Sequence, residues 1–163
     1  VLIKLISVLM STANHSLGGF YPYKMDTKCR VSIPSDWRAE IANGILRLLV
    51  AHDEKVPTLK VLTESEFGKM QRDINDSERL NPAQKRTMLG ALFERSTKTY
   101  MNEQGKLSIP KAQLDHPGLT PGKRLILCGR GNYFVIFNEE NYNKLEAARK
   151  STLEELDAEF QFF

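Results

Sequence analysis

Short apolar runs separated by polar turns recur along the chain, and they predict β-strands. Runs of four apolar or β-branched residues are typical of short strands buried in a core, and two of the runs end at a proline, which stops a strand. The runs form three similar pairs: 31–34 with 107–110, 47–50 with 124–127, and 59–62 with 134–137. A further strand is expected ahead of each member of the first pair, at 21–25 and 98–101.

Helices are expected where a capping residue precedes a helical pattern. Thr63 and Asn138 stand ahead of acidic residues, which suits the N-cap position. Asn81 followed by Pro82 is an N-cap with proline at the first helical position. The apolar residues that follow are spaced as a helical stripe and predict a core-facing side: Met88, Leu89, Leu92 and Phe93. We expect this helix, within 76–96, to bridge two halves of the chain.

The chain contains an internal duplication. Residues 25–34 (MDTKCRVSIP) and 101–110 (MNEQGKLSIP) share Met, Ser, Ile and Pro at positions 76 residues apart. Three later blocks match in the same order at offsets of 75 to 77, as loop insertions and deletions leave them. One copy of about 50 residues buries too little surface to be stable alone. We therefore expect an α+β fold in which two tandem β-hairpin repeats close into one pseudo-twofold, barrel-like unit, with a bridging helix and peripheral helices.

The repeated decapeptide also carries the candidate chemistry. In the first copy Asp26 and Arg30 flank a turn, so the carboxylate can hold the guanidinium in one rotamer. The equivalent residues in the second copy are Asn102 and Lys106, and lysine offers a point charge where arginine offers a two-pronged fork. A strand–turn–strand element can present such basic side chains to a DNA groove. The alternative is that Asp26 and Arg30 only clamp a hairpin on a solvated surface.

The charge of the chain permits a polyanionic partner without requiring one. The 163 residues carry a net charge of +3, of which residues 150–163 contribute −3 and residues 1–149 contribute +6. Three further bases near the first turn would add attraction for phosphate: Lys24, Lys28 and Arg38. No apolar run approaches the about 20 residues that a membrane-spanning helix needs.

Other chemistry has little support in the sequence. Cys29 and Cys128 lie 99 positions apart without a second ligand at metal spacing, so reduced, buried thiols are expected. The histidines are not paired at ligand spacing, the recurring serines lack a His–Asp arrangement, and one glycine pair lacks the third glycine of a dinucleotide loop: His15, His52, His116, Ser32, Ser108, Gly129 and Gly131. We expect no catalytic residues, metal, cofactor or small-molecule substrate.

The first ten residues, VLIKLISVLM, are similar to a weak signal peptide. However, the apolar stretch after Lys4 is short, no cleavage site follows, and the chain begins with Val. An upstream non-Met start, a trimmed chain and initiation at Met10 all fit better. We expect five segments: a poorly ordered leader over 1–18, a first repeat over 19–75, the bridging helix over 76–96, a second repeat over 97–150 and an acidic tail over 151–163.

The repeated turn, followed by a strand that ends in Ile-Pro, resembles the MraZ family, which belongs to the SpoVT/AbrB-like group of bacterial DNA-binding folds. The likeness covers the chain from about Gly19 to Lys150. It rests on Asp26, Arg30 and VSIP in the first copy and on QGKLSIP, LILCG and YFVIFNEENY in the second. The chain departs from the family pattern where Asp, Arg and Gly are usual, with Asn102, Lys106 and Cys29 in those places.

The resemblance implies a transcriptional regulator of the bacterial division and cell-wall gene cluster. Such a protein is cytoplasmic and nucleoid-associated, and binds double-stranded DNA at upstream direct repeats as a ring-shaped homo-oligomer. Together with the turn chemistry it predicts DNA contacts by five bases, oriented by Asp26 and Asn102: Arg30, Lys28, Lys24, Lys106 and Arg38. A second hypothesis keeps the fold but makes the protein an oligomeric, antitoxin-like interaction module. The aromatic end would favour it: Phe160, Phe162 and Phe163.

Overall fold

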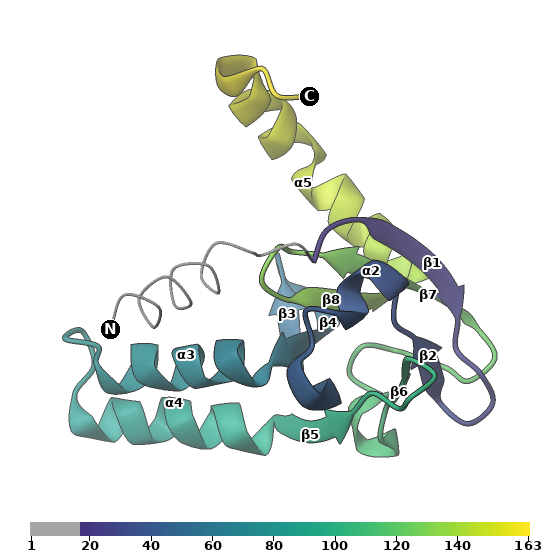
Figure 1. Cartoon of the computed structure of the whole chain (residues 1–163). Helices are drawn as coiled ribbons and strands as arrows, with labels where there is room; N and C mark the ends of the chain where they lie inside the picture. The colour runs from purple at the N-terminus through teal and green to yellow at the C-terminus, as the bar shows by residue number, and fades with distance from the viewer. Residues whose placement is uncertain (1–16) are drawn as a thin grey trace, which may run out of the picture.

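The strands and helices expected from the sequence assemble in the computed structural model, which describes residues 17–163 (Figure 1). The strands are β1 (Phe20–Lys24), β2 (Arg30–Ser32), β3 (Ile45–Asp53), β4 (Val56–Thr63), β5 (Ser96–Tyr100), β6 (Lys106–Ser108), β7 (Arg124–Gly129) and β8 (Phe134–Asn138). The helices are α2 (Ser35–Arg38), α3 (Glu64–Asn75), α4 (Pro82–Glu94) and α5 (Glu139–Phe160), with 3₁₀ turns η1 (Ala42–Gly44) and η2 (Lys111–Gln113). The α+β class is confirmed.

Equivalent strands of the two copies pair with each other. Six strands form an antiparallel sheet in the order β1-β7-β8-β4-β3-β5, while β2 and β6 form a separate two-stranded ribbon. At the centre of the sheet Lys60 of β4 lies opposite Val135 of β8, and in the ribbon Val31 lies opposite Leu107. These partners are equivalent residues of the duplication. Because antiparallel pairing of equivalent residues places them about a twofold axis, the two copies are related by a pseudo-twofold.

The first strand of each copy is exchanged with the other copy. β1 pairs with β7 of the second copy, and β5 pairs with β3 of the first. The predicted turns do join β1 to β2 and β5 to β6, but no hairpin ladder forms between the joined strands. The two tandem repeats are therefore interleaved in space. Local patterns predict strands and turns, whereas the choice of partner depends on burial across the whole sheet.

The expected barrel-like closure is not seen among residues 17–163. β1 and β5 are the two edges of the sheet, and no pairing joins them. Pro22 lies in β1, where the missing N–H is tolerated because an edge strand pairs on one side only. The sheet is open, and the ribbon covers one of its faces instead of extending it.

The main hydrophobic core lies between the ribbon and the sheet. Val31 and Leu107 enter it from the ribbon and are fully buried. Trp37 on α2 is also fully buried, and its ring packs against Tyr21 and Phe134 with centroid separations of 5.2 and 4.8 Å. This packing fixes the ribbon on the sheet, so the turns at the two ends of the ribbon are rigidly placed.

The fold begins before the first predicted repeat. Leu17 is buried and exchanges two backbone hydrogen bonds with Gly131, at 3.0 and 2.9 Å. The indole Nε1 of Trp37 donates to the carbonyl oxygen of Gly18 at 2.9 Å. Leu17 and Gly18 of the expected leader are thus part of the structure, whereas residues 1–16 lie outside the described residues.

The three predicted N-caps are confirmed. The side chains of Thr63, Asn81 and Asn138 each accept a hydrogen bond from the backbone N–H of the third helical residue, at 3.2, 2.9 and 2.7 Å. They start α3, α4 and α5, and Asn81 completes a capping box with Gln84. Caps are predictable because they depend on residues only three positions apart.

α3 and α4 form a helical hairpin that projects from the sheet (Figure 1). Of the apolar stripe predicted on α4, only Leu92 is buried, in a cluster with Phe67 of α3. Met88 is 49% exposed, and Phe93 is exposed as well. The expectation of a core-facing stripe is therefore wrong for these two residues, because the contact with α3 buries Leu92 but leaves about half of Met88 and of Phe93 uncovered within residues 17–163, although the ring of Phe93 touches Phe67.

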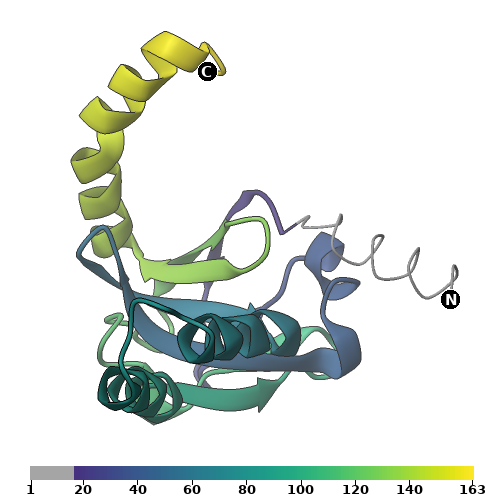
Figure 2. The same ribbon diagram turned by 90° about the vertical axis from the view of Figure 1, so that its left-hand side faces the viewer.

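α5 is the longest helix and leaves the body of the molecule as an arm (Figure 2). Its first turns pack on the sheet through Tyr142 and the buried Leu145. The residues expected to form an acidic tail continue the same helix as far as Phe160. Among the helices of residues 17–163, none combines the length and apolar character needed to cross a membrane.

Candidate nucleic-acid interface

The β2–β6 ribbon turns one face to the core and the other outward. Successive side chains of a strand alternate between faces, so the neighbours of the buried Val31 and Leu107 point away from the core. These neighbours form what we call the ribbon face: Arg30 and Ser32 in β2, and Lys106 and Ser108 in β6. Arg30 is opposite Ser108, and Ser32 is opposite Lys106. The two cations are therefore diagonal neighbours, about 7–8 Å apart between Cα atoms.

Asp26 organises the turn that leads into β2. Its Oδ1 accepts hydrogen bonds from the backbone N–H groups of Lys28 and Arg30, both at 2.9 Å, and its Oδ2 accepts from Nε of Arg30 at 2.8 Å. The backbone N–H of Arg30, then its guanidinium, lower the pKa of the Asp26 carboxyl below its ordinary value despite partial desolvation. The carboxylate is thus charged at neutral pH and fixes the arginine.

The Arg30 guanidinium keeps most of its donors available. The side chain is 31% exposed, and its Nε is held by Asp26. Within residues 17–163 its Nη groups make no hydrogen bond, so both prongs of the fork remain available as donors. A fork oriented in this way can donate two parallel hydrogen bonds to a phosphate or to a guanine edge.

The second turn repeats the backbone arrangement without the ion pair. Oδ1 of Asn102 accepts from the N–H groups of Gln104 and Lys106 at 3.0 and 2.9 Å, as Asp26 does in the first copy. Both turns have a residue with positive φ at the equivalent place, Gly105 at 75° and Cys29 at 59°. Cys29 therefore adopts the conformation that glycine supplies elsewhere. Lys106 has no acidic partner among the described residues and is oriented by its strand alone.

Arg38 belongs to the second turn rather than the first. Its Nε donates to the carbonyl oxygen of Ile33 at 3.0 Å, and its guanidinium lies directly over Gly105, where a Cβ would collide with it. The absence of a side chain at Gly105 thus makes room for Arg38 beside Lys106. Lys28 lies exposed in the first turn. Of the predicted bases, Arg30, Lys28, Lys106 and Arg38 are brought to the two ends of one ribbon.

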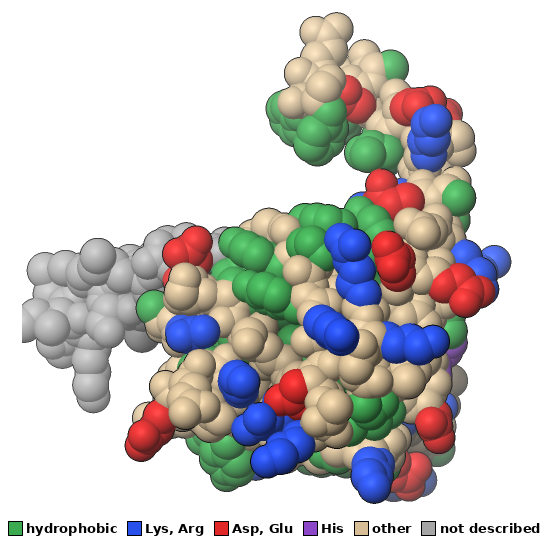
Figure 3. Space-filling model, turned by 90° about the vertical axis from the view of Figure 1, so that its right-hand side faces the viewer, with side chains coloured by type: hydrophobic (Ala, Val, Ile, Leu, Met, Phe, Trp, Pro, Cys, Tyr) green, Lys and Arg blue, Asp and Glu red, His purple; other side chains and the backbone are tan. Residues whose placement is uncertain are grey.

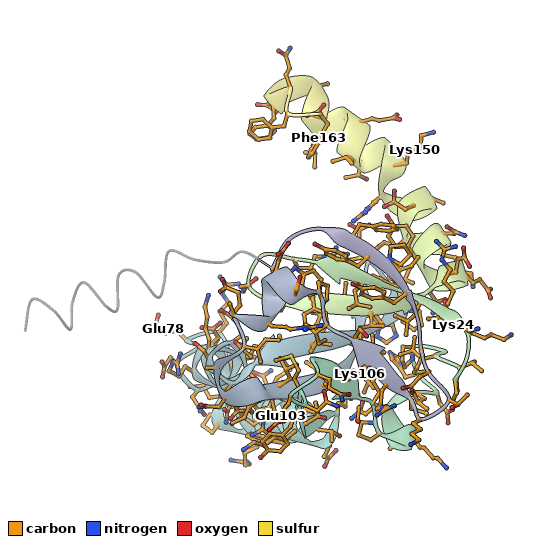
Figure 4. All side chains as sticks on the ribbon, turned by 45° about the vertical axis from the view of Figure 1, so that its right-hand side comes forward. Lys24, Glu78, Glu103, Lys106, Lys150 and Phe163 are labelled. Atoms are coloured by element: carbon orange, nitrogen blue, oxygen red, sulfur yellow. The ribbon has the colours of Figure 1, made fainter. Side chains whose placement is uncertain are left out.

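Lys24 lies apart from this group. It ends β1, where it is paired with Arg124 of β7, and Figure 4 shows it well separated from Lys106. Lys123 and Arg124, both exposed, add to the positive charge there. The sequence prediction of DNA contacts does not include them, although Arg124 begins the predicted strand 124–127. On this side of the molecule Lys and Arg side chains are spread between acidic ones rather than gathered in one patch (Figure 3). The ribbon face, not overall charge, is the distinctive feature.

Named relatives are similar to this chain in sequence over most of its length. The transcriptional regulator MraZ of Marinobacter nauticus is 30% identical over 132 residues, which cover 77% of this chain and 83% of the relative. The chain belongs to the MraZ family. Further MraZ relatives are 29% identical in Hydrogenovibrio crunogenus, over 77% of this chain and 81% of the relative, and 24% identical in an Arthrobacter strain, over 85% and 93%. No family model matches the chain.

A solved structure with limited likeness is the middle domain of FliM from Vibrio alginolyticus. It is 10% identical, with 81% of this chain and 82% of that chain covered, and the TM-score of 0.33 is too low to assign a common fold. Membership of the MraZ family therefore rests on the sequence relatives.

Two histidines that the sequence leaves unpaired meet in this MraZ-family chain. The rings of His52 and His116 are 4.8 Å apart edge to face, and Nε2 of His116 lies 2.6 Å from the carbonyl oxygen of Ala51. They come from β3 and from the loop after η2, so no sequence spacing could signal the pair. No group of three or more His, Cys, Asp or Glu side chains within residues 17–163 is arranged to hold a metal ion.

Proposed function

We propose that this chain is a sequence-specific, DNA-binding transcriptional regulator that uses the ribbon face to contact the duplex. The observation that carries the proposal is the ribbon face itself, with Arg30 and Lys106 displayed as diagonal neighbours on one two-stranded element. A two-stranded ribbon fits the major groove of DNA, where base edges are distinguishable. The names of the MraZ relatives, all transcriptional regulators, support the same function.

Some of the proposed contacts would recognise the DNA sequence, and others would position the protein on the DNA backbone. Arg30 reads a base edge or a phosphate with its fork, and Lys106 supplies a point charge. The hydroxyls of Ser32 and Ser108 share the face and can donate to phosphate oxygens. Lys28, Arg38 and, more distantly, Lys24 add attraction that is independent of sequence and sensitive to salt. In this scheme Asp26 and Asn102 orient the turns without touching DNA, and no catalytic group takes part.

We further propose that several copies assemble into a ring and bind direct repeats in double-stranded DNA upstream of the division and cell-wall genes, in the cytoplasm at the nucleoid. One chain displays a single Arg30, so its own contact is small. Linking several such contacts raises avidity by roughly 10²–10⁴ without any new interaction. Repeated DNA sites are the natural counterpart of a repeated protein surface.

The test is binding of the purified full chain to its own upstream DNA and to shuffled DNA of equal length, at two salt concentrations. We expect upstream DNA to bind at least about 10³ times more tightly than shuffled DNA. We also expect the affinity to fall with salt in proportion to the number of phosphate contacts. Equal affinity for both DNAs at both salt concentrations would refute sequence-specific binding.

A second candidate function is an oligomeric, antitoxin-like interaction module with a protein partner. The exposed apolar residues on α5 and α4 favour it, because such clusters mark contact surfaces. It predicts no binding of upstream DNA above the non-specific level, so the same experiment decides between the two functions.

A further inference from the structure

Exposed large hydrophobic side chains are concentrated in two segments of residues 17–163. One is the far end of α5 and the residues after it: Leu153, Leu156, Phe160, Phe162 and Phe163. The other is α4 with β5: Met88, Phe93 and Tyr100. The one remaining residue of this kind is Phe20, whose ring contacts Tyr142 at 5.1 Å. Exposed apolar residues are ordinarily scattered singly, so two clusters on one chain indicate contact surfaces.

The first cluster continues the apolar stripe that attaches α5 to the sheet. Tyr142 and Leu145 hold the first turns of the helix on the sheet. Leu153, Leu156 and Phe160 follow on the same side at helical spacing, and we call these three the arm stripe. Beyond the edge of the sheet nothing in residues 17–163 covers it, and Leu156 is 54% exposed. The apolar stripe of α5 is thus covered by the sheet at its start and is exposed along the arm stripe.

The end of the arm is a built feature rather than a fraying helix. Gln161 takes the left-handed conformation at φ 58°, and the carboxylate of Asp157 accepts hydrogen bonds from the N–H groups of Phe162 and Phe163 at 2.7 and 3.1 Å. The chain therefore folds back and places the ring of Phe162 5.5 Å from that of Phe160. An aromatic pair is fixed at the tip, ready to contact another surface.

The second cluster lies among basic side chains, whereas the first lies among acidic ones. We call Met88, Leu89 and Phe93 the acceptor face; the ring of Phe93 rests edge-on against Phe67 at 5.5 Å. α4 has one acid, Glu94, which lies on the far side of the helix from Met88 and Phe93 by helical spacing. The bases of α4 are Lys85 and Arg86, and Arg95 follows directly after the helix. The arm is acidic by contrast, with Glu154, Glu155, Asp157 and Glu159.

The two surfaces cannot meet within one molecule. Figures 1 and 2 both place the tip of α5 and the helix α4 at opposite ends. Pairing between two arms would bring their acidic side chains together, which opposes association. We propose that the arm stripe of one copy docks on the acceptor face of a second copy, with acids of the arm beside bases of α4. Apolar burial supplies the contact, and charge selects the partner surface.

The contact joins two different surfaces, so every copy in an assembly offers one free arm and one free acceptor face to the next. Such head-to-tail contacts produce a closed ring when the rotation between copies closes, and a filament when it does not. The inference deepens the self-assembly proposed above and rests on that assembly, but it does not depend on DNA binding.

The test measures molar mass by light scattering and sedimentation of the full chain without DNA. Leu156→Lys places a base against the basic acceptor face, and Met88→Glu places an acid against the acidic arm. We expect each variant to weaken self-association at least about tenfold. Combining both in one chain restores opposite charges at every junction, and we expect at least part of the association to return. Ser151→Lys and Thr87→Glu, on other sides of the same helices, are the matched controls and should associate normally.

Each outcome bears on the proposal. Loss of mass in Leu156→Lys with normal association of Met88→Glu means that two arms pair, which overturns it. Normal association of both single variants overturns the interface but leaves the proposed assembly standing. A monomeric unmodified chain at micromolar concentration overturns the interface and the assembly together. Circular dichroism of each variant confirms that the helices remain folded.

Discussion

At the scale of single residues, the two turns differ by one interaction. Asp26 and Asn102 accept the same pair of backbone N–H groups, but only Asp26 also binds a guanidinium. The first turn therefore presents an oriented arginine and the second a lysine without a partner among the described residues. The duplication has kept the shape of the turn while changing the chemistry displayed on it.

Arg30→Ala should therefore reduce DNA binding more than Lys106→Ala. If Arg30 reads a base edge, we expect a loss of about 1–3 kcal/mol and weaker discrimination between upstream and shuffled DNA. Arg30→Lys keeps the charge but not the fork, so it should retain affinity for phosphate and lose discrimination. Fluorescence anisotropy at two salt concentrations measures both quantities.

The control for Arg30→Ala is folding. An ion pair at the surface contributes little to the free energy of unfolding, so the melting temperature and molar mass should change little. Full-strength, discriminating binding by a folded, normally assembled Arg30→Ala protein would rule out the assigned contact.

Asp26→Asn gives the first turn the same capping residue as the second. It should change how the stability of the fold depends on pH under acid conditions. Folding lowers the pKa of the Asp26 carboxyl, so the charged form contributes stability above the pKa of the unfolded chain, ordinarily about 3.9. That contribution is lost as pH falls through the lower, folded pKa. We expect Asp26→Asn to remove this part of the pH dependence while keeping the turn. Thermal melts between pH 2.5 and 7 measure the difference, to be set against Asp36→Asn as a control for loss of an exposed carboxylate.

At the scale of elements, the turn before β6 requires glycine for two reasons. Gly105 has φ of 75°, and its missing side chain makes room for Arg38. Gly105→Ala should destabilise the fold by about 1–2 kcal/mol from the left-handed backbone alone and displace Arg38 from the ribbon. Chemical denaturation measures the loss. Gly90→Ala, in an exposed turn of α4 with open space around it, should instead stabilise by about 1 kcal/mol. An unchanged free energy of unfolding in Gly105→Ala would contradict the structure.

Much at the element scale could be predicted from sequence, and the misses share a cause. Thr63, Asn81 and Asn138 were identifiable as caps because a cap is decided within three residues. The strand segments were identifiable from their apolar runs. The partners of β1 and β5 were not, since pairing is decided more than 40 residues away along the chain. The spacing of Met88 and Phe93 predicted a helix but could not say whether anything covers that side of it.

In the candidate site, too, contacts between residues close in sequence were predictable and contacts between distant residues were not. The pairing of Asp26 with Arg30 follows from a turn that brings residues four apart together, and it is present as expected. The placement of Arg38 over Gly105 was not foreseeable, because it joins residues from different copies. The sequence shows Ser32 and Ser108 only as recurring serines, whereas their shared position on the ribbon face follows from the register of β2 with β6.

At the scale of the whole molecule, the exchange of β1 and β5 makes each half depend on the other. A chain cut in the loop between α3 and α4 should give two fragments that are unfolded when separate, because every strand of each fragment loses a neighbour. The cut separates β1 from β7, β2 from β6, β3 from β5 and β4 from β8. Mixing the two fragments in equal amounts should restore the sheet. Circular dichroism and amide NMR dispersion report folding. A cooperative melt by either fragment alone, at dilutions where it is monomeric, would contradict this mutual dependence.

The same exchange separates the synthesis of β1 from that of its partner strand. β1 is made about 100 residues before β7, the strand it pairs with. At ribosomal rates of about 5–20 residues per second, the first strand waits roughly 5–20 s with its aromatic residues exposed and its hydrogen bonds unmade. The nascent chain must therefore be kept from premature pairing until its last strands emerge. Slowing translation between the codons for β1 and those for β7 should increase aggregation, whereas slowing it ahead of β1 should not.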